Sequence, residues 1–231
     1  MSLAVVIPVF NEANTIAVLI RDLHNLMLAQ NIPCDFIIVN DGSTDDSLSI
    51  TESLAVSIPG IKIISHNNIG HGPSLLKGYE YALRYEWVLQ LDSDYQYDLS
   101  AVPVLWNNRA AHALLVAERK QRNASGGRDV ITYISRYLIT SMYGSGLKDI
   151  NSPYRLMQTN KLALALQHIH PGSFAPNILI AAWFLKNKLP IFTTIATVKK
   201  DSYERKSRMS WYIFKGSVKA VSDIFLFRFK I

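Results

Sequence analysis

Four apolar runs rich in β-branched residues recur in the first part of the chain, and each is followed by a stretch with helical or turn-forming character. The runs cover residues 3–9, 36–39, 61–64 and 87–91. Their nearly continuous apolar character is typical of strands that are buried on both faces, as in a parallel sheet. Strands and helices that alternate in this way indicate an α/β fold with a mostly parallel, Rossmann-like central sheet flanked by helices.

Polar residues follow three of these runs. Asn11 and Glu12 follow the first, residues 40–46 the second, and Asp92 and Asp94 the fourth. Alternate residues of a strand point the same way, so Asp92 and Asp94 would repel each other unless a cation lay between them. Carboxylates suit Mg²⁺ or Mn²⁺ shared with substrate phosphates. The alternative is a solvated acidic turn. Because ligands bind beyond the carboxyl ends of parallel strands, the three clusters together favour a metal and phosphate site.

The segment Asp41-Gly42-Ser43 suits a nucleotide. Gly42 lets the backbone pass close to a ligand, and the Asp41 carboxylate can accept hydrogen bonds from a ribose or a base N–H. Lys77 and His71 are candidates to face a diphosphate, although Lys77 is equally read as an ordinary exposed helix residue. The glycine-rich signatures of dinucleotide enzymes and of P-loop nucleotide hydrolases do not occur in the sequence, so both classes are disfavoured.

Three blocks, residues 6–12, 39–45 and 91–94, resemble the signature blocks of family 2 glycosyltransferases. Each is weak alone, but three in order at typical spacing are a strong signal. The resemblance implies the GT-A fold, a nucleoside diphosphate sugar donor and a divalent cation, Mg²⁺ or Mn²⁺. In the Asp-x-Asp motif of this fold the second Asp usually takes the metal, so Asp94 is the firmer predicted ligand and Asp92 supports it in binding and catalysis. The other predicted nucleotide-sugar contacts in these blocks are Pro8, Asn11, Glu12, Asp41, Gly42 and Ser43.

The second half resembles the polyprenyl-phosphate branch of that family, represented by dolichyl-phosphate mannose synthase. Residues 149–156 match the Asp-x-x-x-x-Phe/Tyr-Arg-Leu block of this branch. The resemblance places Asp149 near the reacting sugar, as a predicted catalytic residue. A helix-to-strand turn with an Arg155–Asp149 pair is a structural reading of the same run, and the two readings are compatible.

A loop in the branch that closes over the donor phosphates resembles residues 205–211. Arg205, Arg208 and Ser210 are therefore predicted donor contacts, although Arg208 replaces a Gly of that loop. Asn177 stands where many relatives carry Glu, and an amide cannot act as a base. These departures leave the predicted fold intact and put the acceptor in doubt.

Charge divides the chain. Residues 1–117 hold 5 Lys/Arg and 12 Asp/Glu, a balance of −7, whereas residues 118–231 hold 19 and 6, a balance of +13. An acidic half suits a metal, and a basic half suits phosphates or an anionic lipid surface. Uneven charge without a function is the alternative. We predict one catalytic domain over residues 1–210, with a nucleotide-sugar and metal half (1–98) and an acceptor half (99–210), followed by an amphipathic helix (211–231).

The final 21 residues alternate apolar and basic positions at helical spacing, with Phe214, Val218, Val221 and Phe225 predicted on one face. Such a helix fits a membrane interface with anionic lipid, or a place against the core, which is the commoner case. The sequence contains no signal peptide and no apolar run long enough to cross a membrane. The single cysteine, Cys34, suits a reducing compartment. The predicted location is cytoplasmic, with peripheral contact at the inner face of the cell membrane as an option.

The predicted reaction is an inverting sugar transfer by a metal-dependent hexosyltransferase. The predicted acceptor is a polyprenyl phosphate or a glycan or lipid precursor of the cell surface, and a phosphate needs no general base. If a base is needed, Asp149 is the candidate. A nucleotidyltransferase remains an alternative, because it would also pair carboxylates around Mg²⁺. A nucleic-acid binder is disfavoured, since the sequence offers no recognised module and its acidic half would repel a phosphate backbone.

Overall fold

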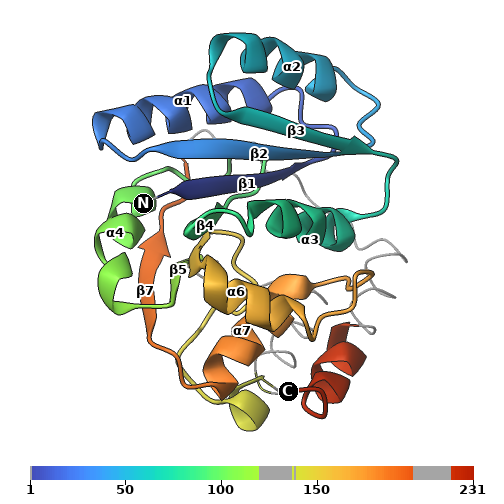
Figure 1. Ribbon diagram of the computed structural model, residues 1–231, viewed down its shortest axis with the longest axis vertical. Coiled ribbons are helices and arrows are strands. Elements are labelled where there is room, and N and C mark those ends of the chain that lie inside the picture. Colours follow the sequence, from blue (N-terminus) through green and yellow to red (C-terminus); the bar gives the residue numbers. More distant parts are fainter. Residues whose placement is uncertain (1, 120–136, 138, 200–219) are drawn as a thin grey trace.

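A computed structural model describes residues 2–119, 137, 139–199 and 220–231 (Figure 1). The strands are β1 Leu3–Val9, β2 Cys34–Asp41, β3 Ile61–His66, β4 Trp87–Gln90, β5 Leu114–Arg119, β6 Arg155–Gln158 and β7 Ile191–Ala196. Helices of the described residues include α1 Ile16–Ala29, α2 Ser47–Ser57, α3 His71–Ala82, α4 Ala101–Asn107, α6 Thr159–Leu166 and α7 Pro176–Lys186. A short 3₁₀ helix covers Arg109–Ala111. Residues 139–143 and 220–227 are also helical.

The described strands form one sheet in the order β3-β2-β1-β4-β6-β5-β7. Strands β1 to β4 are mutually parallel, and β7 runs parallel to β5. Only β6 among them is antiparallel to its neighbours, β4 and β5. The α/β prediction of a mostly parallel sheet is therefore confirmed.

The sheet separates two apolar cores. Along β1, Val5 and Ile7 face the core shared with α1, α2 and α4, whereas Ala4 and Val6 face the core shared with α3, α6 and α7. Figure 1 shows α1 and α2 on one side of the sheet and α3 on the other. Because both faces of β1 are covered, all seven of its residues are buried. This double burial is the physical reason for the unbroken apolar run in the sequence.

The register of the parallel strands places their carboxyl ends at one level. Val9 on β1 pairs with Asn40 on β2, and Val6 pairs with Gln90 on β4. The segments that follow these strands therefore begin side by side. They carry the polar clusters that the sequence analysis singled out.

Three elements of the second half differ from the predicted pattern. Strand β6 and the helices α6 and α7 were not predicted as such. Helix α7 is buried over nearly its whole length and belongs to the core that it shares with α3 and α6. Its burial explains the long uncharged stretch in this part of the sequence. Within the ranges that the structure describes, no helix has the length and apolar character to cross a membrane.

The C-terminal helix (residues 220–227) packs on the same core as α7. Ile224 and Phe227 are buried, and the Tyr143 hydroxyl donates to the Ile224 carbonyl over 2.5 Å. The predicted apolar face is only partly right, because Phe225 points outward with 54% of its surface exposed. The buried stripe is shifted because it meets the Tyr143 ring. The predicted boundary between residues 210 and 211 lies outside the described residues.

Candidate functional site

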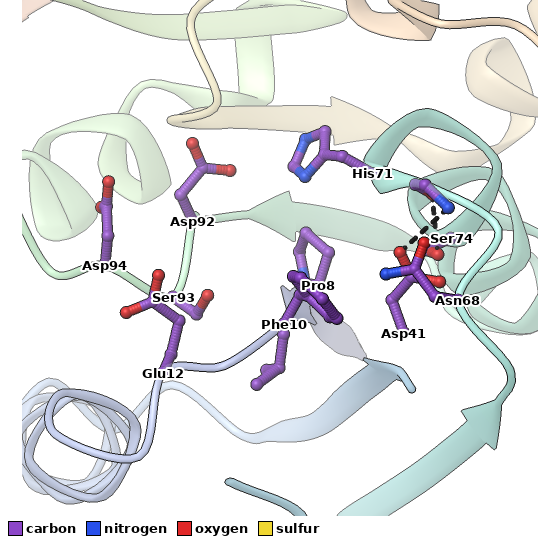
Figure 2. A pocket seen from close by; sticks show the side chains of 12 residues that line it. Pro8, Phe10, Glu12, Asp41, Asn68, His71, Ser74, Asp92, Ser93 and Asp94 are labelled. Atoms are coloured by element: carbon purple, nitrogen blue, oxygen red, sulfur yellow. Dashed lines mark hydrogen bonds between the residues drawn. The ribbon is translucent and has the colours of Figure 1, made fainter. Parts of the chain in front are cut away.

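A pocket of about 420 Å³ opens at the carboxyl ends of β1, β2 and β4, beside the first turn of α3 (Figure 2). In Figure 2 the carboxylates of Asp92 and Asp94 lie at one end and Asp41 with Asn68 at the other, with Pro8 and Phe10 between them. The residues that line the pocket are Pro8, Val9, Phe10, Glu12, Asp41, Asn68, Gly70, His71, Ser74, Asp92, Ser93 and Asp94. Five of the predicted site residues, Pro8, Glu12, Asp41, Asp92 and Asp94, therefore share one cavity.

One carboxylate oxygen at the acidic end of the pocket lacks a hydrogen bond from the described residues. Asp92 Oδ1 is buried and has no hydrogen-bond partner among the described residues. Figure 2 shows the carboxylates of Asp92 and Asp94 directed to the same side of their loop. An unpaired buried carboxylate oxygen beside a second carboxylate is costly without a compensating cation. This oxygen donor set fits Mg²⁺ or Mn²⁺.

The residues that the structure describes do not complete a metal cage by themselves. In the described part of the chain, no group of three or more His, Cys, Asp and Glu side chains is arranged to hold a metal ion. Divalent ions of this kind are commonly bound by one or two carboxylates together with water and substrate phosphates. The two carboxylates therefore fit a cation that enters with a phosphate ligand.

Asp41 forms the opposite end of the pocket and is buried, with 3% of its surface exposed. Its Oδ1 accepts a hydrogen bond from the Ile69 N–H at 2.7 Å and its Oδ2 one from the Gly70 N–H at 3.0 Å. The carboxylate thus fixes the chain that leads into α3. Oδ1 also lies 3.5 Å from His66 Nδ1. Since a carboxylate oxygen has two lone pairs, Oδ2 is the oxygen with a second acceptor position for a ligand.

Gly42 follows Asp41 with a φ of +68°. A Cβ at this position would lie 2.6 Å from the Asn68 backbone nitrogen. Only glycine fits such a close approach in the left-handed region. Gly42 therefore sets the position of Asn68 at the edge of the pocket and does not itself line it.

Asn11 and Ser43 join two loops at the sheet edge. The Asn11 N–H donates to Ser43 Oγ at 3.1 Å, and Asn11 Oδ1 accepts from the Thr44 N–H at 2.8 Å. Next to them the Glu12 N–H donates to Ser47 Oγ at 2.8 Å. These contacts shape the pocket rim from the loops after β1 and β2. Neither Asn11 nor Ser43 is among the lining residues, and their predicted nucleotide contacts stay predictions.

Phe10 and Asn68 line the pocket and were not predicted. Phe10 directly follows β1 and has 46% of its surface exposed. A large exposed aromatic ring at a pocket suits stacking with a planar group. The signal was present in the sequence as an aromatic residue next to the Asn11-Glu12 pair. Asn68 carried no such signal, because only the turn at Gly42 brings it to the site.

Lys77 lies apart from the pocket lining, and three further predicted residues cannot be placed. Lys77 is exposed on α3, while His71, one and a half turns earlier, is a lining residue. Arg205, Arg208 and Ser210 lie outside the described residues. Their donor contacts stay predictions.

Asp149 pairs with Arg119, and the predicted pair with Arg155 is wrong. Arg119 Nε lies 2.6 Å from Asp149 Oδ2, and Nη2 lies 2.9 Å from Oδ1. Burial pushes the pKa of Asp149 upward, but the bonds and positive charge of Arg119 hold it below the usual value of a carboxyl. Asp149 is not among the pocket-lining residues.

Tyr97 connects this ion pair electrostatically to the acidic end of the pocket. Burial raises the pKa of Tyr97; Arg119 lowers it, and Asp149, Asp94 and Asp92 raise it. The ring therefore lies within electrostatic reach of both carboxylate groups. The Arg119–Asp149 pair is consequently a neighbour of the loop that carries Asp92 and Asp94.

Arg155 is fully buried and bonds to backbone carbonyls. Its Nε and Nη2 donate to the Ser152 carbonyl, Nη1 to that of Asn177 at 2.9 Å, and Nη2 also to that of Ile150 at 3.2 Å. Because these hydrogen bonds go to backbone carbonyls, Arg155 does not form the hydrogen-bonded pair with Asp149. It fixes the loop after Asp149 against the start of α7.

Asn177, where a Glu is common in the resembling branch, takes part in a buried polar network. Its Nδ2 donates to Gln90 Oε1 at 2.9 Å, and the Tyr79 hydroxyl lies 2.7 Å from Gln90 Oε1 and 2.9 Å from Asn177 Oδ1. Gln90 comes two residues before Asp92 on the same chain segment. The network therefore joins α7 to the strand that carries the acidic loop.

Comparison with known proteins agrees with this geometry. The model of glycosyl transferase family 2 matches residues 4–175, more than half of the chain. The chain belongs to glycosyl transferase family 2. This membership confirms the resemblance found in the three sequence blocks.

Relatives include a prophage bactoprenol glucosyl transferase homolog of Escherichia coli, 30% identical over 128 residues, which are 54% of this chain and 42% of the relative. A cholesterol galactosyltransferase of Borreliella burgdorferi is 35% identical over 108 residues, 47% of this chain and 29% of the relative. The chain thus spans less than half the length of these relatives.

The fold resembles that of glucosyl-3-phosphoglycerate synthase from Mycobacterium tuberculosis in complex with UDP. The TM-score is 0.71 at 18% identity, covering 100% of this chain and 81% of that one. The same enzyme in complex with Mn²⁺, UDP and its product gives a TM-score of 0.67 at 19% identity, covering 98% and 79%. These likenesses confirm the GT-A fold.

Proposed function

We propose that this family 2 protein transfers a sugar from a nucleoside diphosphate sugar with the aid of a divalent cation. The observation that carries the proposal is the unpaired buried oxygen of Asp92 beside Asp94, in the same cavity as Asp41. The GT-A fold and the Mn²⁺ and UDP held by similar structures support it.

The nucleobase of the donor is proposed to stack on Phe10. Its N–H group would donate a hydrogen bond to the second acceptor position of Asp41 Oδ2, at the end of the pocket near Asn68. The diphosphate then lies toward the acidic end, past the first turn of α3. The N–H groups of that turn favour anions, and His71 lines the same wall. Glu12 borders the acidic end from the loop after β1.

Asp94 and Asp92 would hold the cation together with the donor phosphates. A bound Mg²⁺ or Mn²⁺ supplies charge stabilisation for the departing diphosphate. The remaining task of the chain is to place the acceptor oxygen behind the anomeric carbon, which gives inversion. The positive charge balance of residues 118–231, +13, favours an acceptor that is itself an anion.

A phosphate acceptor suits the residues around Asp149. Both oxygens of this carboxylate bond to Arg119, and its pKa is lowered. A carboxylate with a lowered pKa is a poor base for a hydroxyl, whereas a phosphate oxygen needs none. The bactoprenol glucosyl transferase relatives support a polyprenyl phosphate acceptor. A glycan or another lipid that reacts through a hydroxyl would need a general base. Asp149, the candidate, is a poor base because its pKa is lowered.

Contact with a membrane surface is proposed for the C-terminal helix. Phe225, Leu226 and Phe229 are 54%, 52% and 75% exposed, and Arg228 and Lys230 beside them are exposed cations. Aromatic rings and cations together suit the headgroup region of anionic lipid. A variant with Ser at the three apolar positions should float less with acidic liposomes than the unaltered protein. Equal flotation of the variant and the unaltered protein would contradict the proposed membrane contact.

The decisive experiment offers UDP-, GDP- and dTDP-sugars with Mn²⁺ or with EDTA, and polyprenyl phosphate or polyprenol as acceptor. Release of nucleoside diphosphate that needs both Mn²⁺ and polyprenyl phosphate is the expected result. Release of sugar 1-phosphate, with the nucleotide on the acceptor, would instead show a nucleotidyltransferase. Activity that persists in EDTA would remove the cation from the proposal.

A further inference from the structure

Tyr95, the residue after Asp94, has a left-handed backbone with a φ of +49°. This conformation is unfavourable for a residue with a large side chain, and it persists only where the surroundings enforce it. Ser93 and Asp94 form a turn that Tyr95 closes. The direction of the acidic loop therefore depends on what holds Tyr95.

Two groups of opposite charge hold the Tyr95 side chain. Its hydroxyl donates to Asp22 Oδ2 on α1 at 2.6 Å. The Lys199 ammonium lies 3.3 Å from the centre of its ring. A hydrogen bond to a carboxylate and a cation over a ring are both stronger than neutral contacts. The side chain thus ties the acidic loop to α1 and to the segment after β7.

The backbone after Tyr95 pairs with the same segment. The Asp98 N–H donates to the Thr197 carbonyl and the Lys199 N–H to the Gln96 carbonyl, each at 2.9 Å. A bridge between Tyr97 and Val198 lies between these two bonds. The loop that carries Asp92 and Asp94 is therefore anchored just after its turn, by main chain and by side chain.

We propose that Tyr95 is a positioning residue that aims Asp94 and so sets the affinity of the site for its divalent cation. The proposal rests on the cation assigned above. Support from outside the ligands commonly changes metal affinity by about 10- to 100-fold. The variant Tyr95→Phe removes the hydroxyl and keeps the ring, so it tests the hydrogen bond to Asp22 separately from the other contacts.

The test compares Tyr95→Phe with Tyr85→Phe. The Tyr85 hydroxyl also donates to a carboxylate, Asp35 Oδ2, at 2.6 Å. Asp35 lies at the amino end of β2, away from the pocket. The two variants thus lose the same bond at opposite ends of the sheet. The first readout is hydrogen exchange of the 92–98 amides without metal, and the second is Mn²⁺ affinity by electron paramagnetic resonance with UDP present.

Tyr95→Phe should speed exchange at 92–98 and weaken Mn²⁺ binding by about tenfold. Tyr85→Phe should change neither. Asp22→Ala should reproduce the effect, and the double variant should lose no more than either single one, because the two residues share one bond. If the unaltered protein binds Mn²⁺ and Tyr95→Phe binds it equally, this inference alone is overturned. If the unaltered protein binds no Mn²⁺, the cation of the proposed function falls as well.

Discussion

The Arg119 guanidinium bonds to both carboxylate oxygens of Asp149, over 2.6 Å and 2.9 Å, and the Arg119 N–H donates to the same carboxylate at 3.2 Å. The two residues come from the end of β5 and from a loop thirty positions later. The pair favours the ionised form of Asp149 and fills three of the four acceptor positions of its carboxylate. It places a charged, preorganised wall next to the acidic end of the pocket.

Replacing Asp149 by Asn should lower the free energy of unfolding by about 1–3 kcal/mol at neutral pH, because Arg119 loses its counter-charge. The lower part of that range applies, since 37% of the Arg119 side chain is exposed. The folded pKa of Asp149 is lowered, so its stabilisation is present above the unfolded value of about 3.9 and is lost as the pH falls through the folded value.

Urea unfolding between pH 3 and pH 8 measures this difference. It should be constant above about pH 5 and shrink below about pH 4. A difference that grows on acidification would contradict the depressed pKa. Asp98→Asn is the matched control, because its carboxylate bonds to Ser100.

Asp92→Asn should abolish the thermal protection that Mn²⁺ and UDP give. In the unaltered protein, ligand at a hundred times its Kd should add about 2.7 kcal/mol. Without metal, the variant should be no less stable, because Asp92 Oδ1 has no partner among the described residues and an amide removes repulsion with Asp94. Differential scanning fluorimetry measures both, with Asp46→Asn as control. Full protection in Asp92→Asn would exclude that carboxylate from the cation site.

Gly72→Ala should destabilise the start of α3 by about 1–3 kcal/mol. A Cβ there would lie 2.1 Å from the Ser173 carbonyl oxygen and 2.7 Å from that of Phe174, and backbone atoms cannot rotate away. Gly172→Ala is the control, because its Cβ would meet only the His170 ring at 3.3 Å. Chemical unfolding of both variants gives the comparison. Equal stability would mean that the 173–174 segment shifts freely.

Arg155→Lys should cost about 1–3 kcal/mol although the charge is kept. Lys cannot reproduce the planar fork that reaches the carbonyls of Ile150, Ser152 and Asn177, so buried acceptors lose their donors. Arg21→Lys, at an exposed position of α1, should change stability by less than about 0.5 kcal/mol. Urea unfolding of the two variants measures the contrast. Matching values would show that the guanidinium geometry is unimportant.

The first half of the fold could be predicted because its pattern is local. The strands β1, β2 and β4 are buried on both faces, so their apolar runs stand out, and parallel pairing brings Asp41, Asp92 and Asp94 to one edge. Nothing beyond strand direction was needed to bring these carboxylates together.

The second half of the fold depends on distant partners and was harder to predict. Strand β6 has four residues and begins with a buried Arg155, whose donors are satisfied by carbonyls from the loop just before the strand and from the distant α7. The partner of Asp149 lies thirty residues earlier in the chain. No periodicity records such a pair, because each residue has several possible partners until the strands are in register.

Strand β6 also has a consequence for the order of folding. It joins β4 to β5, and β5 in turn carries β7. A nascent chain that has not yet reached residue 155 would have β4 as an unpaired edge and β5 without its inner neighbour. Unpaired edges invite association with other chains, and long-range pairing is slow. Once β6 and β7 have been synthesised, they pair with β4 and β5 and cover the exposed edges. Truncations before residue 155 should therefore aggregate.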